Sequence, residues 1–110
     1  MDASWELFVD CTSEKSAITV SRKYLERIEK VEASPQIEAY HKGGFKVIFS
    51  TKHKSTSWPD FIYEIMSTAQ KASRNWVISG SIAEEVDLWS NEHSVIGVTS
   101  VHLQATRVYA

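Results

Sequence analysis

QIEAYHKGGFKVIFSTK, residues 36–52, decides the fold, because it has the pattern of two strands joined by a glycine turn. Apolar and polar side chains alternate over Gln36–His41 and again over Phe45–Lys52, as in strands with one buried face. Lys42-Gly43-Gly44 lies between them, and glycine tolerates the positive φ of a tight turn. The stretch therefore predicts a β-hairpin in which Ile37 and Ala39 face the same side as Phe45, Val47 and Phe49.

An amphipathic helix is expected on each side of this hairpin. Upstream, Thr12 or Ser13 can serve as the N-cap, and Ser34-Pro35 breaks the helix. Downstream, Ser57 precedes Pro59 and Asp60, and the second helix is expected to end at Arg74-Asn75. The apolar positions at helical spacing are Ala17, Ile18, Ser21, Tyr24, Leu25 and Ile28 in the first helix, and Trp58, Phe61, Ile62, Ile65, Met66, Ala69 and Ala72 in the second.

Three more segments have strand patterns: Trp5–Cys11, Trp76–Ile82 around Gly80, and the long segment Val95–Val108. The apolar phase of the last segment shifts by one residue, which predicts a β-bulge near Thr99-Ser100. The resulting order is β-α-β-β-α-β with a C-terminal β extension. This order predicts an α+β fold of the ferredoxin-like split βαβ class, an antiparallel sheet with two helices on one face.

Length and composition predict a single globular domain over residues 1–110, since 43% of the residues are hydrophobic and 24% are charged. The net charge of −2 provides no general positive field, so no nucleic-acid partner is expected. Cys11 has no second cysteine to pair with, and the first ten residues do not resemble a signal peptide. No apolar run is long enough to span a bilayer. We therefore expect a cytoplasmic protein without membrane contact.

Motifs for catalysis, metals and cofactors are missing from the sequence. His41, His53, His93 and His102 do not occur at metal-ligand spacing, no serine lies in a G-x-S-x-G motif, and Lys42-Gly43-Gly44 is too short for a phosphate loop. We expect no metal, no cofactor and no enzymatic activity. Cys11 is expected to be a buried core thiol, and Lys52-His53-Lys54 a solvated turn.

The segment IAEEVDLWSNEH, Ile82 to His93, combines acidic side chains with a tryptophan. Two arrangements remain open. In one, Val86 and Leu88 form a short strand beside the last strand while Trp89 packs into the core; in the other, Trp89 stays partly exposed as an interface anchor. The carboxylates would steer a basic partner in both arrangements. The expected binding residues are Glu84, Glu85, Asp87, Trp89, Glu92 and His93.

With Glu84-Glu85-Val86-Asp87-Leu88-Trp89 and Glu92, this small, mildly acidic α+β chain resembles bacterial immunity proteins, the antidotes of contact-dependent growth inhibition. The resemblance implies a tight one-to-one complex with a basic toxin domain, for example a nuclease, and no cofactor. A small-molecule-binding or enzymatic protein of the dimeric α+β-barrel type, using His41 or His102, is the alternative. A homodimer formed through the free sheet face, where Phe8, Tyr40, Ile48 and Val77 are expected, is a third possibility.

Overall fold

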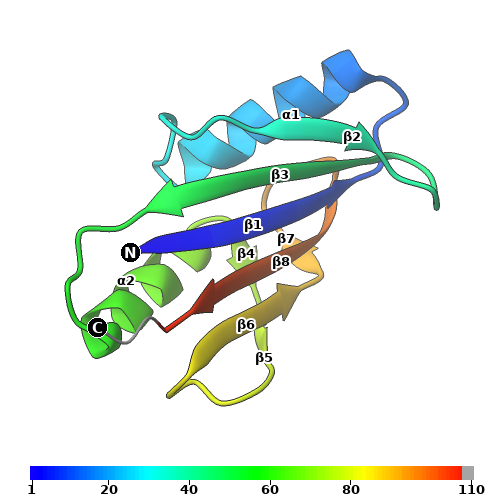
Figure 1. Ribbon diagram of the computed structural model, residues 1–110. Helices are drawn as coiled ribbons and strands as arrows, with labels where there is room; N and C mark the ends of the chain where they lie inside the picture. Colours follow the sequence, from blue (N-terminus) through cyan, green and yellow to red (C-terminus); the bar gives the residue numbers. More distant parts are fainter. Residues whose placement is uncertain (108–110) are drawn as a thin grey trace.

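The computed structural model describes residues 1–107, in which two helices cover one face of a six-stranded antiparallel sheet (Figure 1). The sheet has the order β2-β3-β1-β8-β6-β5. Its strands are β1 (Asp2–Val9), β2 (Gln36–Ala39), β3 (Phe45–Lys52), β5 (Val77–Ile78), β6 (Glu85–Ser90) and β8 (Val98–Thr106). The helices are α1 (Glu14–Arg27) and α2 (Trp58–Ala69), and a separate two-stranded sheet pairs β4 (Ser73–Arg74) with β7 (Glu92–His93).

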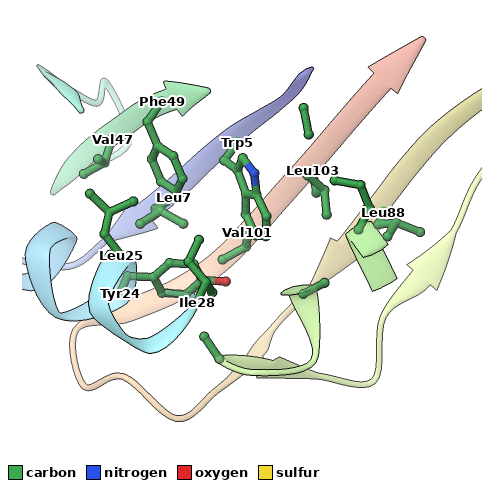
Figure 2. Close-up of a cluster of buried hydrophobic side chains, with 14 of the residues drawn as sticks. Trp5, Leu7, Tyr24, Leu25, Ile28, Val47, Phe49, Leu88, Val101 and Leu103 are labelled. Atoms are coloured by element: carbon green, nitrogen blue, oxygen red, sulfur yellow. The ribbon is translucent and has the colours of Figure 1, made fainter. Parts of the chain in front are cut away.

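The hydrophobic core lies between the helices and one face of the sheet. The alternation in β1 buries Trp5 and Leu7 completely, while Phe8 on the opposite side is only half-buried. Figure 2 shows Trp5 at the centre of the core, and its indole stacks on the ring of Phe49 at 5.7 Å and meets the edge of Tyr24 at 6.2 Å. Burying side chains of this size supplies much of the free energy that stabilises the fold.

The opposite face of the sheet is covered by no helix or second sheet within residues 1–107. We call it the open face. Its central side chains are Glu6 and Phe8 of β1, Glu38 of β2, Lys46 of β3, Asp87 and Trp89 of β6, and His102 of β8. Directly opposed residues of antiparallel strands point to the same side, so the strand pairing places these side chains together.

Both helix starts predicted from the sequence are confirmed. The Ser13 hydroxyl accepts a hydrogen bond from the backbone amide of Ser16 at 3.2 Å, and α1 begins at Glu14, directly after Ser13. Ser57 accepts one from the Asp60 amide at 3.4 Å, with Pro59 in the first turn of α2. These caps satisfy amides that have no partner within the helix.

The predicted hairpin is also confirmed, with Ile37 opposite Val47 and Ala39 opposite Phe45. Gly44 is required at the turn, because its φ is +74° and a Cβ there would lie 2.1 Å from the carbonyl oxygen of Val9. The turn thus packs closely against the end of β1. Gly43, with φ +99°, has open space around its Cα.

The segment after α2 differs from the sequence prediction. The helix ends at Ala69 rather than at Arg74-Asn75, because Ser73–Arg74 pairs as β4 with β7 and Asn75 has a φ of 51°. The predicted strand Trp76–Ile82 is wrong beyond Val77–Ile78, since Gly80 has a φ of +73° and the chain then turns toward β6. The strand beside β1 is the C-terminal β8, and β6 separates β8 from β5.

The first and last strands along the chain have bounds that differ from the prediction. β1 spans Asp2–Val9, so Cys11 lies beyond its end and is half-buried rather than a fully buried core thiol. β8 begins at Val98, and the predicted end of the last strand at Val108 lies outside the described residues. The predicted β-bulge is confirmed, because Phe8 pairs with Ser100 and Val9 with Val98, which leaves one extra residue in β8.

Candidate functional site

The acidic segment forms an inner strand of the sheet. Val86 and Leu88 of β6 face the core and are 1% and 0% exposed, while Trp89 is 37% exposed on the open face. The segment therefore combines the two arrangements left open by the sequence: the strand pairs with β8, and the tryptophan points away from the core. Successive side chains of a strand point to opposite faces, so Trp89 points away from the face on which Val86 and Leu88 are buried.

The six predicted binding residues do not form one surface. Glu85, Asp87 and Trp89 share the open face, and Glu84 is exposed in the turn before β6. After Ser90 the chain leaves the main sheet, so the remaining two residues, Glu92 and His93, lie in β7 on the helix side.

The side chains of these two residues are already engaged within the fold. The Glu92 carboxylate accepts a hydrogen bond from the side-chain amide of Asn75 at 2.5 Å. The His93 Nδ1 lies 2.7 Å from the Ser73 hydroxyl, which in turn lies 2.9 Å from the hydroxyl of the buried Tyr24. Burial also lowers the pKa of His93 below its ordinary value. The structure therefore does not bring Glu92 and His93 together with Glu85, Asp87 and Trp89.

A row of aromatic rings crosses the open face. The Trp89 indole stacks on the His102 imidazole with centroids 4.0 Å apart and planes within 10°. The Phe8 ring lies 6.1 Å from Trp89 and 5.2 Å from Tyr40, which follows β2. Strands far apart in the sequence bring these rings together, and only the alternation in β1 and the first hairpin strand indicated that Phe8 and Tyr40 point this way.

Charged side chains beside the row form a hydrogen-bonded network. The His102 Nε2 lies 2.7 Å from an Asp87 oxygen, and its Nδ1 lies 3.5 Å from a Glu6 oxygen. The Lys46 ammonium lies 3.5 Å from Glu6 and 3.5 Å from Glu38. Although partial desolvation alone lowers the pKa of Lys46, the two carboxylates raise it above its ordinary value.

The balance of charge on the open face is acidic. In the strand register, the carboxylates of this face belong to Asp2, Glu6, Glu38, Glu85 and Asp87, and its ammonium groups to Lys46 and Lys52. Clustered charge of one sign gives a surface a potential that attracts ligands of the opposite sign. The open face can therefore attract a cationic ligand or a basic protein.

A hollow of about 450 Å³ lies at the end of the open face, where the turn between β2 and β3 meets β1 and β8. Phe8, Tyr40 and Trp89 contribute rings to its wall, and Asp10 and Lys42 contribute charges. No histidine is among the described residues that line it, so His102 contributes to the row but not to the hollow. A concave aromatic surface of this size accommodates a side chain of a partner or a small ligand.

A second polar cluster, at the end of β3, is buried. The Trp5 indole N–H donates to the Thr51 hydroxyl at 2.9 Å, and that oxygen lies 2.7 Å from Nε2 of His53. The His53 Nδ1 lies 2.5 Å from a Glu64 carboxylate oxygen, so the chain of hydrogen bonds joins the core to α2. The expectation that His53 lies in a solvated turn was wrong, because its side chain is 0% exposed.

The acid, imidazole and hydroxyl of this cluster are ordered as in a nucleophilic triad, but Thr51 is only 2% exposed. A buried hydroxyl that already accepts the Trp5 N–H has no access to a substrate. Burial, more than any other effect, lowers the pKa of His53, which favours a neutral ring that donates from Nδ1 to Glu64 and accepts from Thr51 at Nε2. The cluster therefore stabilises the fold.

Other features of the described chain have no reactive geometry. Burial, and to a smaller extent the carboxylate of Asp10, raise the pKa of the Cys11 thiol, so the thiol stays protonated at neutral pH. Within residues 1–107, no three histidine, cysteine or acidic side chains converge as metal ligands would. Neither helix of this part of the chain is long and apolar enough to cross a membrane.

No protein-family model, curated protein or solved structure matches this chain.

Proposed function

We propose that this protein is a non-enzymatic protein-binding module, an immunity protein that neutralises a basic toxin domain by covering it with the open face. One observation carries the proposal: a half-buried aromatic row with the exposed Trp89 lies on a sheet face on which five carboxylates accompany two lysines. Interface hot spots are enriched in tryptophan and tyrosine, and surrounding charge speeds the encounter with a partner of opposite sign.

A nuclease domain is a fitting partner, because enzymes that hold phosphates have positively charged surfaces. The carboxylates of Glu85, Asp87 and Glu38 would occupy positions that phosphates take on such a surface. Trp89 and Phe8 would supply apolar contact between them, since acidic side chains alone contribute little affinity. Glu92 and His93 are left out of this interface because they lie on the helix side.

We also propose that the core belongs to the ferredoxin-like class. The adjacency of β2, β3, β1 and β8, all antiparallel, supports this assignment, with both helices on one face. In this description β8 is the fourth strand, and β5 and β6 are an insertion between α2 and β8. The insertion widens the sheet on the side of Trp89, and so enlarges the open face.

The dimeric α+β-barrel alternative would place the open faces of two copies against each other and enclose a ligand between them. The hollow beside Phe8 favours such a ligand. In a two-fold symmetric dimer, however, the same surface patch meets itself, so two sheet faces rich in carboxylates, among them Glu6, Glu38 and Asp87, would lie against each other. Sedimentation equilibrium at increasing salt tests this alternative, because screening would strengthen a dimer of this kind.

Co-expression tests the proposed function. An immunity gene lies directly downstream of a large toxin gene, so we would express the C-terminal domain encoded by that neighbour with and without this protein. We expect the domain to arrest growth alone and to be neutralised in a one-to-one complex. A neighbouring metabolic operon, or growth arrest that persists on co-expression, would contradict the proposal.

A further inference from the structure

The hollow on the open face has a specific chemical composition. The aromatic residues Phe8, Tyr40 and Trp89 line it, together with the acidic residue Asp10. The small side chain of Ser100 also lines it and lies opposite Phe8 in the strand register. The hollow thus combines aromatic residues with one acidic residue, Asp10, and one basic residue, Lys42.

Two hydrogen bonds and one close backbone contact fix the backbone around this hollow. The Thr99 hydroxyl donates to the Phe8 carbonyl at 2.9 Å, at the β-bulge where the register shifts. The Asp10 amide donates to the Gly97 carbonyl at 3.0 Å, and the close approach of Gly44 to Val9 fixes the turn. A binding surface that is formed before its ligand arrives loses less entropy on binding.

We propose that the hollow accepts an arginine side chain, supplied by the basic partner of the open face. The faces of aromatic rings attract cations, and the flat guanidinium group both stacks on rings and forms paired hydrogen bonds with a carboxylate. The proposed immunity function enters only in naming the source of the arginine. The hollow, with its rings and Asp10, is independent of that function.

The position of Lys42 decides between a cationic and an anionic ligand. Lys42 lines the same hollow, so its positive charge repels a guanidinium group and attracts a phosphate. Removing this charge must therefore change the affinity in opposite directions for the two ligand types. The acidic balance of the face, with Glu6, Glu38 and Asp87 beyond the hollow, favours the cation.

The test uses the full chain and a blocked Gly-Arg-Gly peptide, titrated while the indole N–H resonance of Trp89 is followed by NMR. The Trp89→Phe variant assigns that resonance. We expect saturable shifts, and binding about tenfold weaker for the peptide with citrulline, which has the shape of arginine without its charge. Lys42→Ala should tighten arginine binding several-fold, and Asp10→Asn should weaken it.

Controls separate this site from general attraction to an acidic protein. Tyr63→Leu removes an aromatic ring that is 77% exposed on α2, and it should leave the titration unchanged, whereas Phe8→Leu should weaken binding. Equal binding of the arginine and citrulline peptides, or weaker binding after Lys42→Ala, would overturn the inference. Stronger binding of a short oligothymidylate at the same resonance, lost in Lys42→Ala, would overturn it in favour of a stacked base.

Failure of this inference can be told apart from failure of the proposed function. If the toxin domain binds with unchanged affinity to Phe8→Leu and Asp10→Asn, the immunity function stands and the arginine site does not. If the peptide binds as described while the neighbouring domain is neither bound nor neutralised, the arginine site stands and the immunity function fails.

Discussion

Thr51 is the position at which one methyl-for-hydroxyl exchange tests the buried polar cluster. Thr51→Val keeps the shape of the side chain and removes both hydrogen bonds of its hydroxyl, to the Trp5 indole and to His53. The Trp5 N–H and the His53 Nε2 each lose a partner, at a cost of about 1–3 kcal/mol each, so we expect the free energy of unfolding to fall by roughly 2–6 kcal/mol. That is a large part of the ~5–15 kcal/mol that stabilises a typical domain.

Urea unfolding followed by far-UV circular dichroism measures this loss without depending on tryptophan fluorescence. With a slope of about 2 kcal/mol per M urea, the midpoint should fall by roughly 1–3 M. Thr51→Ser is the matched control, because it keeps the hydroxyl and loses one methyl group, at a cost of about 1 kcal/mol. Equal midpoints for the Val and Ser variants would refute the hydrogen-bonded chain from Trp5 to Glu64.

The other predictions concern acid sensitivity, the hairpin turn and the two faces of the sheet. Burial lowers the pKa of His53 and of His93 below the ordinary 6.5, so below that pH the unfolded chain binds more protons than the folded chain. The free energy of unfolding should therefore fall as the pH drops below 6.5. His53→Gln and His93→Gln should each reduce this pH dependence in urea titrations. Burial alone would raise the pKa of Glu64, but hydrogen bonds from Ser55 and His53 lower it below the ordinary 4.5. Protonation of this carboxyl group should therefore reduce the stability further below that pH. Gly44→Ala should lower the melting temperature more than Gly43→Ala, because only at Gly44 does the new Cβ meet a backbone oxygen, and equal effects would contradict the close packing of the turn. Trp5→Ala should cost about 3–5 kcal/mol and Trp89→Ala under about 1.5 kcal/mol in the same assay, with a reversed order showing that Trp89 is the core residue.

Local patterns were enough to predict much of the fold. The caps at Ser13 and Ser57, the glycine turn and the phase shift in the last strand are all encoded within a few residues of where they occur. The end of α2 was mispredicted because Ala72 continues the apolar period, whereas pairing of Ser73–Arg74 with β7 determines where the chain leaves the helix. Such a pairing depends on residues nearly twenty positions away.

The candidate site was predictable only in part, for the same reason. Alternation separates Trp89 from Val86 and Leu88, but it does not say which side of the strand is covered. That Trp89 lies against His102 and Phe8 follows from the order of β1, β8 and β6, which no single segment specifies. The burial of His53 was not predicted, because its neighbours Lys52 and Lys54 are charged and exposed and the run is typical of a solvated turn.

The proposal that the acidic open face binds a basic partner is tested most directly by calorimetric titration with the proposed partner, the C-terminal domain encoded by the gene directly upstream. Glu38→Lys with Glu85→Lys reverses two exposed charges on this face, and Glu26→Lys with Glu32→Lys reverses two exposed charges away from it. We predict affinity roughly ten- to hundredfold weaker for the first pair, with the difference shrinking in high salt, and unchanged affinity for the second pair. Equal affinities for the two pairs would contradict the account.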